Sequence, residues 1–285
     1  NSYPFPQYSS EELDVKLNEW KKVFSKIDKN KVHHILDAGC GTGSASLNLA
    51  TLFPKAQVTG INISEKSIEY ANKMANELNL DNVKFIVANI LDLNGDLTKQ
   101  KYDIIICKGV LHHTLTPEKG MHILSELCNF NGYFYLSMYH PGKYSNFFSR
   151  KILDIFIGRN FAHRLKWAKK LFTNKCRQII EQRKKDKAMS LAADLPSELI
   201  TDVMIADRFC VPIENYHTLY KQYKLLKNSN FEDFETSLNL SDFRKLPGIR
   251  SITAKNSLTY LLLDLLCIVK RVEQTYILAK KKSAA

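Results

Sequence analysis

A glycine-rich turn is the first feature of this sequence that could do chemistry. In the stretch ILDAGCGTGSASLNLA, residues 35–50, an apolar run ends at Asp37 and a run with helical spacing follows. Glycines between them remove side chains where the backbone turns tightly and a ligand approaches: Gly39, Gly41 and Gly43. The start of the next helix offers unpaired N–H groups. We therefore expect a ligand-binding turn, the alternative being a tight turn without a ligand.

A second group of candidate residues follows two later apolar runs. His112 and His113 come after YDIIICKG. Tyr139 is the last residue of NGYFYLSMY, and His140 follows it. Histidine is the usual proton acceptor near neutral pH. Open α/β sheets bind ligands at the carboxyl ends of their strands. We expect His113, Tyr139 and His140 to be candidate catalytic residues, with packing and helix capping as the alternative roles.

Alternating strands and helices must position these residues. Short apolar runs at 32–38, 57–63, 83–90, 102–109 and 131–139 read as strands, and helical patterns at 11–28, 44–53, 64–80 and 118–130 lie between or before them. This alternation predicts a doubly wound, seven-stranded and mostly parallel α/β sheet covered on both faces. Two later strands are expected at 231–239 and 250–257, and a helix near 214–228.

The rhythm breaks after the fifth strand, where the chain becomes strongly basic. Residues 141–190 carry 14 Lys and Arg against 3 Asp and Glu, and so hold nearly all of the net charge of +12. Five segments follow from these patterns: an N-terminal aromatic segment and helix (1–29), a core (30–140), a basic helical insertion (141–206), the end of the sheet domain (207–257) and a C-terminal helix (258–285). The last helix has more apolar positions than one free surface needs, so it packs on the sheet domain or forms a homodimer seam.

Other features limit the class of protein. The six cysteines form no CxxC pair and lie mostly in apolar runs, which is typical of reduced thiols in a cytoplasmic protein and predicts no metal site. The sequence has no apolar run long enough to span a membrane and no signal peptide at its start.

Several motifs in order resemble the class I S-adenosylmethionine (SAM) methyltransferases. The turn matches their motif Asp/Glu-x-Gly-x-Gly-x-Gly, and VTGINIS, VKFIVANILDL, YDIIICKGVLHHT and CNFNGYFYLSMY resemble the next four strand motifs. The glycines fall at every second residue, unlike the Gly-x-Gly-x-x-Gly pattern of dinucleotide-binding dehydrogenases. The resemblance implies a Rossmann-like fold, SAM as the cofactor, and residues 30–140 as the SAM-binding core.

The resemblance also implies roles for individual residues. The methionine part of SAM would lie against Asp37, Gly39, Cys40, Gly41, Gly43 and Lys108, and its ribose and adenine against Asn62, Ile63, Asn89 and Ile90. Asn62 and Asn89 stand where the family most often has Asp. Asparagine keeps a carbonyl acceptor but loses charge assistance, at a cost of about 1 kcal/mol per site. We therefore expect a weakened cofactor clamp rather than a lost one.

The stretch DRFCVPIENYHT resembles a segment found in methyltransferases of undefined substrate. This resemblance would place Asp207, Glu214 and His217 beside the substrate, helix capping being the alternative. The basic insertion would then be a lid over a small-molecule or lipid-like substrate that is methylated on oxygen or nitrogen. A phosphate-binding face of an RNA or protein methyltransferase, contact with a membrane surface, and a non-catalytic binding protein are the alternatives; nucleic acid is the less favoured partner because the fourth-strand motif lacks the Asn/Asp-Pro-Pro-aromatic tetrad.

Overall fold

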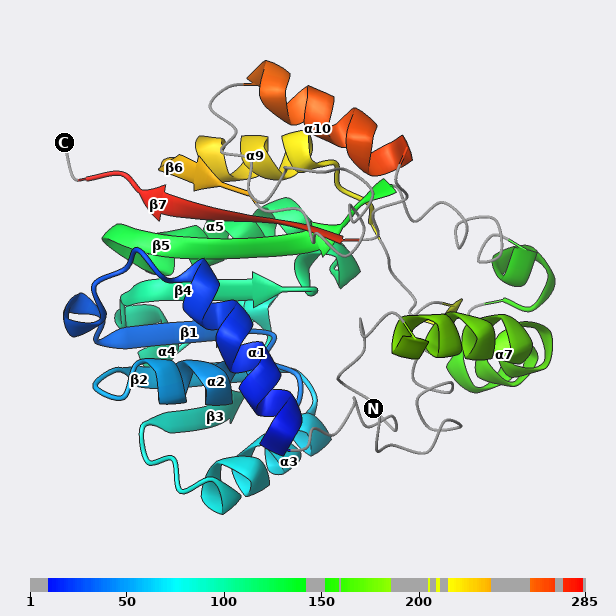
Figure 1. Ribbon diagram of the computed structural model, residues 1–285, viewed down its shortest axis with the longest axis horizontal. Coiled ribbons are helices and arrows are strands. Elements are labelled where there is room, and N and C mark those ends of the chain that lie inside the picture. The colour runs from blue at the N-terminus through cyan, green and yellow to red at the C-terminus, as the bar shows by residue number, and fades with distance from the viewer. Residues whose placement is uncertain are drawn as a thin grey trace.

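A seven-stranded sheet forms the centre of the protein (Figure 1). The computed structural model describes residues 10–141, 152–158, 160–185, 205, 209–210, 215–236, 257–269 and 274–283. The strands follow the order β3-β2-β1-β4-β5-β7-β6, and every pairing among β1 to β5 is parallel whereas β7 runs antiparallel to both its neighbours. Their bounds are β1 His34–Ala38, β2 Gln57–Asn62, β3 Val83–Val87, β4 Tyr102–Lys108, β5 Cys128–Tyr139, β6 Phe231–Glu235 and β7 Gln274–Lys281. The predicted fold class is confirmed.

Helices cover both faces of the sheet because its central strands bury apolar side chains on both sides. The helices are α1 Ser10–Val23, α2 Ser44–Leu52, α3 Glu65–Glu77, α4 Asp96–Lys99, α5 Pro117–Leu127, α7 Phe161–Lys185, α9 Leu219–Asn228 and α10 Ser257–Val269, with short 3-10 turns η1 Lys29–Lys31, η2 Ile90–Asp92 and η3 Leu111–His113. Along β4, Ile104 and Ile106 pack under α1 and α2, whereas Ile105 and Cys107 pack under α5, α9 and α10.

The end of the chain differs from the sequence prediction. The C-terminal helix expected over residues 258–285 is confirmed as far as Val269, but β7 then occupies the space between β5 and β6. Thr275, Ile277 and Ala279 are fully buried, at the period of two that a strand requires. This alternation was overlooked because it follows an apolar helix of 13 residues closely. The strand predicted at 250–257 falls outside the described residues, except for residue 257, which begins α10.

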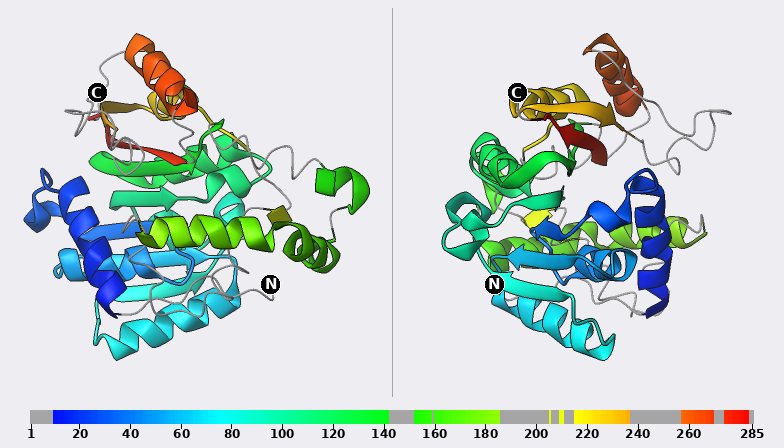
Figure 2. Two further views of the ribbon diagram at one scale, coloured as in Figure 1. Left: turned by 45° about the vertical axis from the view of Figure 1, so that its right-hand side comes forward. Right: turned by 90° about the vertical axis from the view of Figure 1, so that its left-hand side faces the viewer.

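The basic insertion after β5 packs around a small apolar cluster of its own. This cluster contains Leu153, Ala168, Cys176, Ile205, Phe209 and Cys210. The buried Arg164 of α7 forms an ion pair with Asp154 and so ties α7 to the helical turn at 152–156. Figures 1 and 2 place α7 beyond the carboxyl ends of β1 and β4. The helical insertion predicted after the fifth strand is thus present, on the side of the sheet where ligands bind in such folds.

Candidate active site

The glycine turn between β1 and α2 is held by the neighbouring strand and leaves open space above one glycine. The N–H groups of Gly39 and Cys40 both donate to the carbonyl oxygen of Ile61, at 2.8 and 2.9 Å. Gly39 and Gly41 have φ values of +87° and +57°, which side chains rarely adopt. A Cβ on Gly39 would lie 2.3 Å from Val110, whereas a Cβ on Gly41 would meet no atom within 4 Å. The main chain at Gly41 is therefore accessible to a ligand.

Gly43 tightens the end of the same turn. A Cβ there would lie 2.9 Å from the Cβ of Ala71 on α3 and 2.9 Å from the ring of Phe85 on β3. The three glycines thus serve different purposes: Gly39 and Gly43 permit close packing of the turn against its neighbours, and Gly41 leaves the main chain accessible.

Asp37 is a buried acid beneath this turn. Its carboxylate accepts a hydrogen bond of 2.7 Å from the Ser46 hydroxyl of α2, and the residue is 2% exposed. Burial raises the pKa of Asp37 to about 6, against the opposing effects of the Ser46 hydrogen bond and the positive charge of Lys108. Lys108, at the end of β4, is exposed and its ammonium lies 5.5 Å from the centroid of the Trp20 ring. A positively charged group brought to this place would favour the ionised form of Asp37.

The ends of β2 and β3 offer amide and apolar side chains. Asn62 is half-buried, and its Oδ1 accepts the N–H of Ser64 at 2.8 Å; the Oδ1 of Asn89 accepts the N–H of Leu91 at 3.0 Å. Asn89 is thus the N-cap of η2, whereas Asn62 forms a turn ahead of Ser64, the N-cap of α3. Each Asn keeps its NH₂ and a second lone pair for a ligand. Ile63 is 63% exposed, as a residue that covers a flat ring would be. Ile90, in contrast, lies in the core at 7% exposure.

An aromatic cluster stands at the ends of β4 and β5. The ring of His112 lies 4.1 Å from that of His113 and 4.0 Å from that of Tyr139. The N–H of Tyr139 donates to Nδ1 of His112 at 3.3 Å, so the neutral His112 carries its proton on Nε2. His112 is buried, whereas His113 and Tyr139 are half-buried. The structure thus brings the predicted candidates His113 and Tyr139 together.

The segment that precedes α9 closes this cluster from the other side. The N–H of Asn215 donates to the carbonyl of His112 at 2.7 Å, and the N–H of His217 donates to the carbonyl of Tyr139 at 2.8 Å. His217 is 2% exposed, and neither of its ring nitrogens has a hydrogen-bond partner. Burial and the nearby Lys221 lower the pKa of His217. Asp207 and Glu214, predicted from the same stretch, lie outside the described residues.

His140 is engaged in a different way. It is fully buried, and its Nε2 lies 3.0 Å from Oδ1 of Asp264 on α10. The Asp264 carboxylate also accepts the N–H groups of Leu219 and Tyr220, at 2.6 and 2.9 Å, which are the first two of α9. His140 and Asp264 thus join β5, α9 and α10. Asp264 was missed from the sequence, although a single acid in the apolar run LTYLLLDLLCIV is a signal for such a role.

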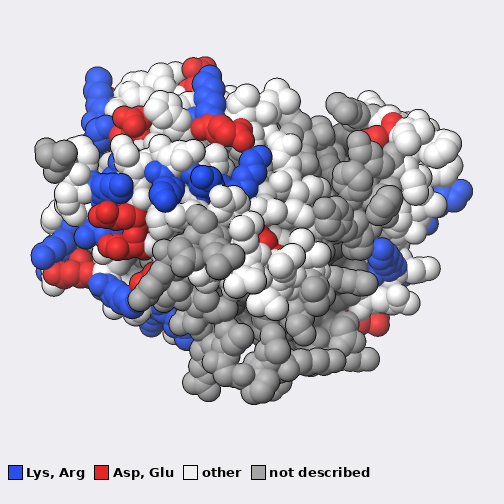
Figure 3. All heavy atoms as spheres, turned by 90° about the horizontal axis from the view of Figure 1, so that it is seen from above, with Lys and Arg blue, Asp and Glu red and all other residues white. Residues whose placement is uncertain are grey.

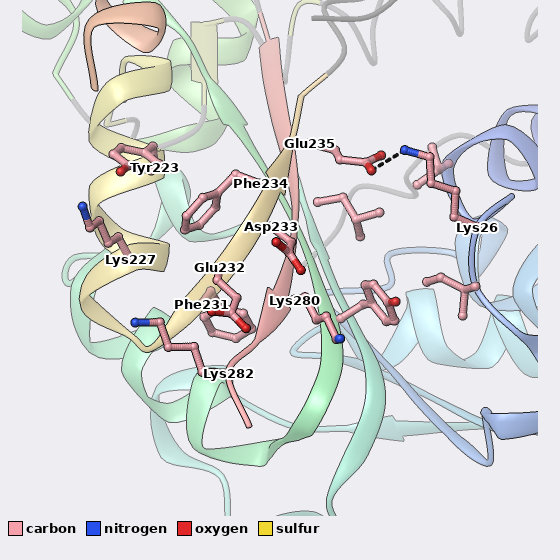
Figure 4. A pocket seen from close by; sticks show the side chains of 14 residues that line it. Lys26, Tyr223, Lys227, Phe231, Glu232, Asp233, Phe234, Glu235, Lys280 and Lys282 are labelled. Carbon is pink, nitrogen blue, oxygen red and sulfur yellow. Dashed lines mark hydrogen bonds and ion pairs between the residues drawn. The ribbon is translucent and has the colours of Figure 1, made fainter. Parts of the chain in front are cut away.

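A groove of about 710 Å³ lies elsewhere on the molecule (Figure 4). Its lining includes Tyr133 at the start of the parallel part of β5, Lys280 at the end of β7, and the ion pair of Lys26 with Glu235 at 2.5 Å. Since β7 is antiparallel to β5, this groove lies at the amino edge of the parallel strands, opposite the glycine turn. Because open α/β sheets bind ligands at the carboxyl ends of their strands, the candidate active site is the carboxyl edge and not this groove.

The described residues contain no group of three or more His, Cys, Asp or Glu side chains placed to hold a metal ion. All six cysteines are buried, and none of them forms a disulfide bond. Among the helices that the structure describes, none is long and apolar enough to cross a membrane.

Comparison with known proteins identifies the family. A family model described as "Methyltransferase domain" matches residues 29–204 of this chain. Together with the strand order and the glycine turn, this match shows that the chain belongs to the class I SAM-dependent methyltransferases. The cofactor of this family is SAM. The residues present fit it, because an accessible glycine main chain, a buried acid and an exposed Ile63 lie together at the carboxyl edge.

Three relatives illustrate the range of similarity. The uncharacterized protein RP028 of Rickettsia prowazekii is 36% identical over 105 residues, 36% of this chain and 41% of that protein. Ribosomal RNA small subunit methyltransferase G of Staphylococcus aureus is 31% identical over 101 residues, 35% of this chain and 39% of that protein. The matches thus span less than half of these curated relatives. The structure of PKMT2 from Rickettsia typhi in complex with AdoHcy resembles this fold with a TM-score of 0.58 and 18% identity, over 89% of this chain and 49% of that one.

Proposed function

We propose that this protein transfers a methyl group from SAM to an oxygen or nitrogen atom of a small-molecule or lipid-like substrate. The observation that carries this proposal is the position of His217. A buried imidazole without hydrogen-bond partners stands beside the aromatic cluster of His113 and Tyr139, at the strand ends next to the glycine turn. The six cysteines are buried and none forms a disulfide bond, which favours a cytoplasmic setting.

The cofactor side of the site would work through position and charge. When bound, SAM supplies an electrophilic methyl group on a sulfonium centre. The main chain at Gly41 would contact the methionine part, and Asp37, ionised, would attract its ammonium group. Asn62 would bind the ribose hydroxyls with its NH₂ group and remaining lone pair, and Ile63 would cover the adenine. These residues orient the cofactor, and alignment of two reactants is a large part of catalysis by such enzymes.

His217 would accept the proton of the substrate. Burial lowers its pKa, so the ring is neutral near pH 7 and can take a proton. Leaving two buried ring nitrogens without partners costs free energy, and a hydroxyl or amine of the substrate would remove that cost. His113 and Tyr139 would form the wall against which this substrate packs. His140, held by Asp264, would position the end of β5 and is not proposed to touch the substrate.

The test is transfer of labelled methyl from SAM into extracts separated into small molecules, lipids, RNA and protein. We expect label in the small-molecule or lipid fraction. His217→Asn should lower kcat at least about a hundredfold, the low end of what general base catalysis contributes, with SAM affinity unchanged. His122→Asn, on the exposed face of α5, is the matched control and should be neutral. Full activity of His217→Asn would contradict the assigned role.

An RNA or protein substrate is the second candidate, because residues 141–190 carry 14 basic against 3 acidic residues. Label in the RNA or protein fraction, with activity that falls steeply as salt rises, would favour it. SAM binding without label in any fraction would favour a binding protein that has kept the fold.

A further inference from the structure

The outer surface of the insertion combines exposed apolar and basic side chains. Ile155 and Phe156, in the helical turn at 152–156, are 74% and 79% exposed. On α7, Trp167 and Leu171 are one turn apart and 38% and 53% exposed. Isolated exposed apolar residues are ordinary, but several large ones on one small lobe mark an interaction surface.

On α7, basic side chains lie beside the exposed apolar ones, and acidic residues are scarce in the described part of the insertion. Lys166 and Lys170 are exposed on the same helix, and the ammonium of Lys170 lies 5.2 Å from the centroid of the Trp167 ring. Asp154 and Glu181 are the acidic residues among the described part of the insertion, and Asp154 is neutralised by Arg164. In Figure 3 this lobe, on the right, shows mostly uncharged surface with a few basic and a few acidic side chains, whereas charged side chains of both signs are denser over the sheet domain on the left.

We propose that this lobe docks on an anionic lipid surface, with Ile155 and Phe156 entering the interface and the lysines of α7 facing the headgroups. Apolar burial and attraction to anionic lipids together give interfacial binding. The combination of exposed apolar and basic side chains favours a lipid surface over a nucleic acid. Phosphates of a nucleic acid would attract the lysines, but exposed isoleucine, leucine and phenylalanine side chains gain little from a phosphate backbone. A lipid surface satisfies both kinds of side chain.

The position of the lobe gives this docking a consequence. α7 lies beyond the carboxyl ends of the parallel strands, where the candidate active site stands (Figures 1 and 2). Docking through the lobe would bring that site close to the lipid surface. A substrate that resides in or on the bilayer would then reach the site without leaving the membrane. Docking itself requires neither the cofactor nor methyl transfer, so it goes beyond the proposed function and is testable without it.

The test is co-sedimentation of the protein with vesicles of phosphatidylcholine alone and with about a third phosphatidylglycerol. We expect binding to the anionic vesicles and little to the neutral ones. Phe156→Ser should weaken binding about tenfold through lost apolar burial, and Lys166→Gln with Lys170→Gln should weaken it at least as much. Phe130→Ser, which removes a phenylalanine that is 63% exposed at the start of β5, is the matched control and should change nothing.

Circular dichroism of each variant checks that it is still folded. Each should keep the helical signal of the wild type, because the altered side chains are exposed. Equal binding to both kinds of vesicle by all variants would overturn the proposal, as would no binding to either. Binding to RNA that collapses with salt, without vesicle binding, would overturn it in favour of a nucleic-acid surface.

Discussion

Asp37 should make cofactor binding depend on pH in the slightly acidic range. Burial raises its pKa to about 6 in the free protein. The ammonium group of the cofactor stays protonated below about pH 7.7, so over this range the titrating partner is the carboxylate. Ionised Asp37 attracts that ammonium and protonated Asp37 does not. Affinity should therefore be greatest above the pKa of Asp37 and fall as pH falls through it.

The size of the effect follows from the ionised fraction. With a pKa near 6, about one tenth of the molecules carry an ionised Asp37 at pH 5 and about nine tenths at pH 7. The affinity for S-adenosylhomocysteine should thus be about tenfold lower at pH 5 than at pH 7, which is about 1.4 kcal/mol. Isothermal titration calorimetry at constant ionic strength measures it directly. Ser46→Ala removes a hydrogen bond that lowers the pKa, and should move the midpoint to higher pH.

Asp37→Asn is the decisive variant. It should bind more weakly at every pH and show no change between pH 5 and pH 7, because the titrating carboxyl is gone. An affinity that does not change between pH 5 and pH 7 in the wild type would show that ionisation of Asp37 does not control cofactor binding. So would an unchanged slope in Asp37→Asn, since the titrating group would then be another residue.

The remaining predictions concern stability and the cofactor clamp. Without ligand, the raised pKa of Asp37 means that ionisation of this carboxyl opposes folding, at a cost that is absent below about pH 4 and complete above about pH 6. Asp37→Asn should therefore stabilise the free protein at pH 7 by up to about 3 kcal/mol, measured by urea unfolding. This gain should vanish toward pH 4. Asn62→Asp should tighten S-adenosylhomocysteine binding about fivefold by calorimetry, because a charged acceptor replaces a neutral one. Gly39→Ala should cost more than about 2 kcal/mol in the same unfolding assay because its Cβ would clash with Val110. Asp264→Ala should cost about 2–5 kcal/mol because three hydrogen bonds to the carboxylate are lost.

Each of these predictions has a clear contrary outcome. Gly95 has a φ of +61° and open space around its Cβ position, so Gly95→Ala is the control for Gly39→Ala and should cost only backbone strain. Equal losses for these two variants would contradict the assigned clash with Val110. Unchanged affinity in Asn62→Asp would show that this position does not contact the ribose. A stable Asp264→Ala protein would mean that the buried carboxylate does not hold α9 and α10 together.

Local patterns predicted the first half of the fold well. The glycine turn, β1 to β5 and their parallel order follow from short β-branched runs that alternate with helices, because the central runs, β1 and β4 above all, are buried on both faces and leave a clear signal. The last strand was missed for the opposite reason. β7 owes its place to its antiparallel pairing with β5 and β6, a non-local interaction. Its residues, read in sequence, continue an apolar helix.

Individual residues of the candidate site could be predicted from the sequence, but the contacts between residues far apart in the chain could not. Glycine spacing identified the cofactor turn, and histidines after strands identified candidates. The sequence could not show that His140 meets Asp264, since 124 positions separate them. Nor could it show that His217 lies beside the end of β5, because the backbone hydrogen bond to Tyr139 forms only when the sheet is complete.

Calorimetric titration of the purified protein with S-adenosylhomocysteine shows directly whether the glycine turn belongs to a cofactor site. We expect one site per chain with micromolar affinity, weakened somewhat by asparagine at positions 62 and 89. Asp37→Asn should bind more weakly in the same experiment. The absence of binding up to millimolar ligand, in a sample with the expected helical and strand signals, would contradict the assignment of a SAM site to this turn.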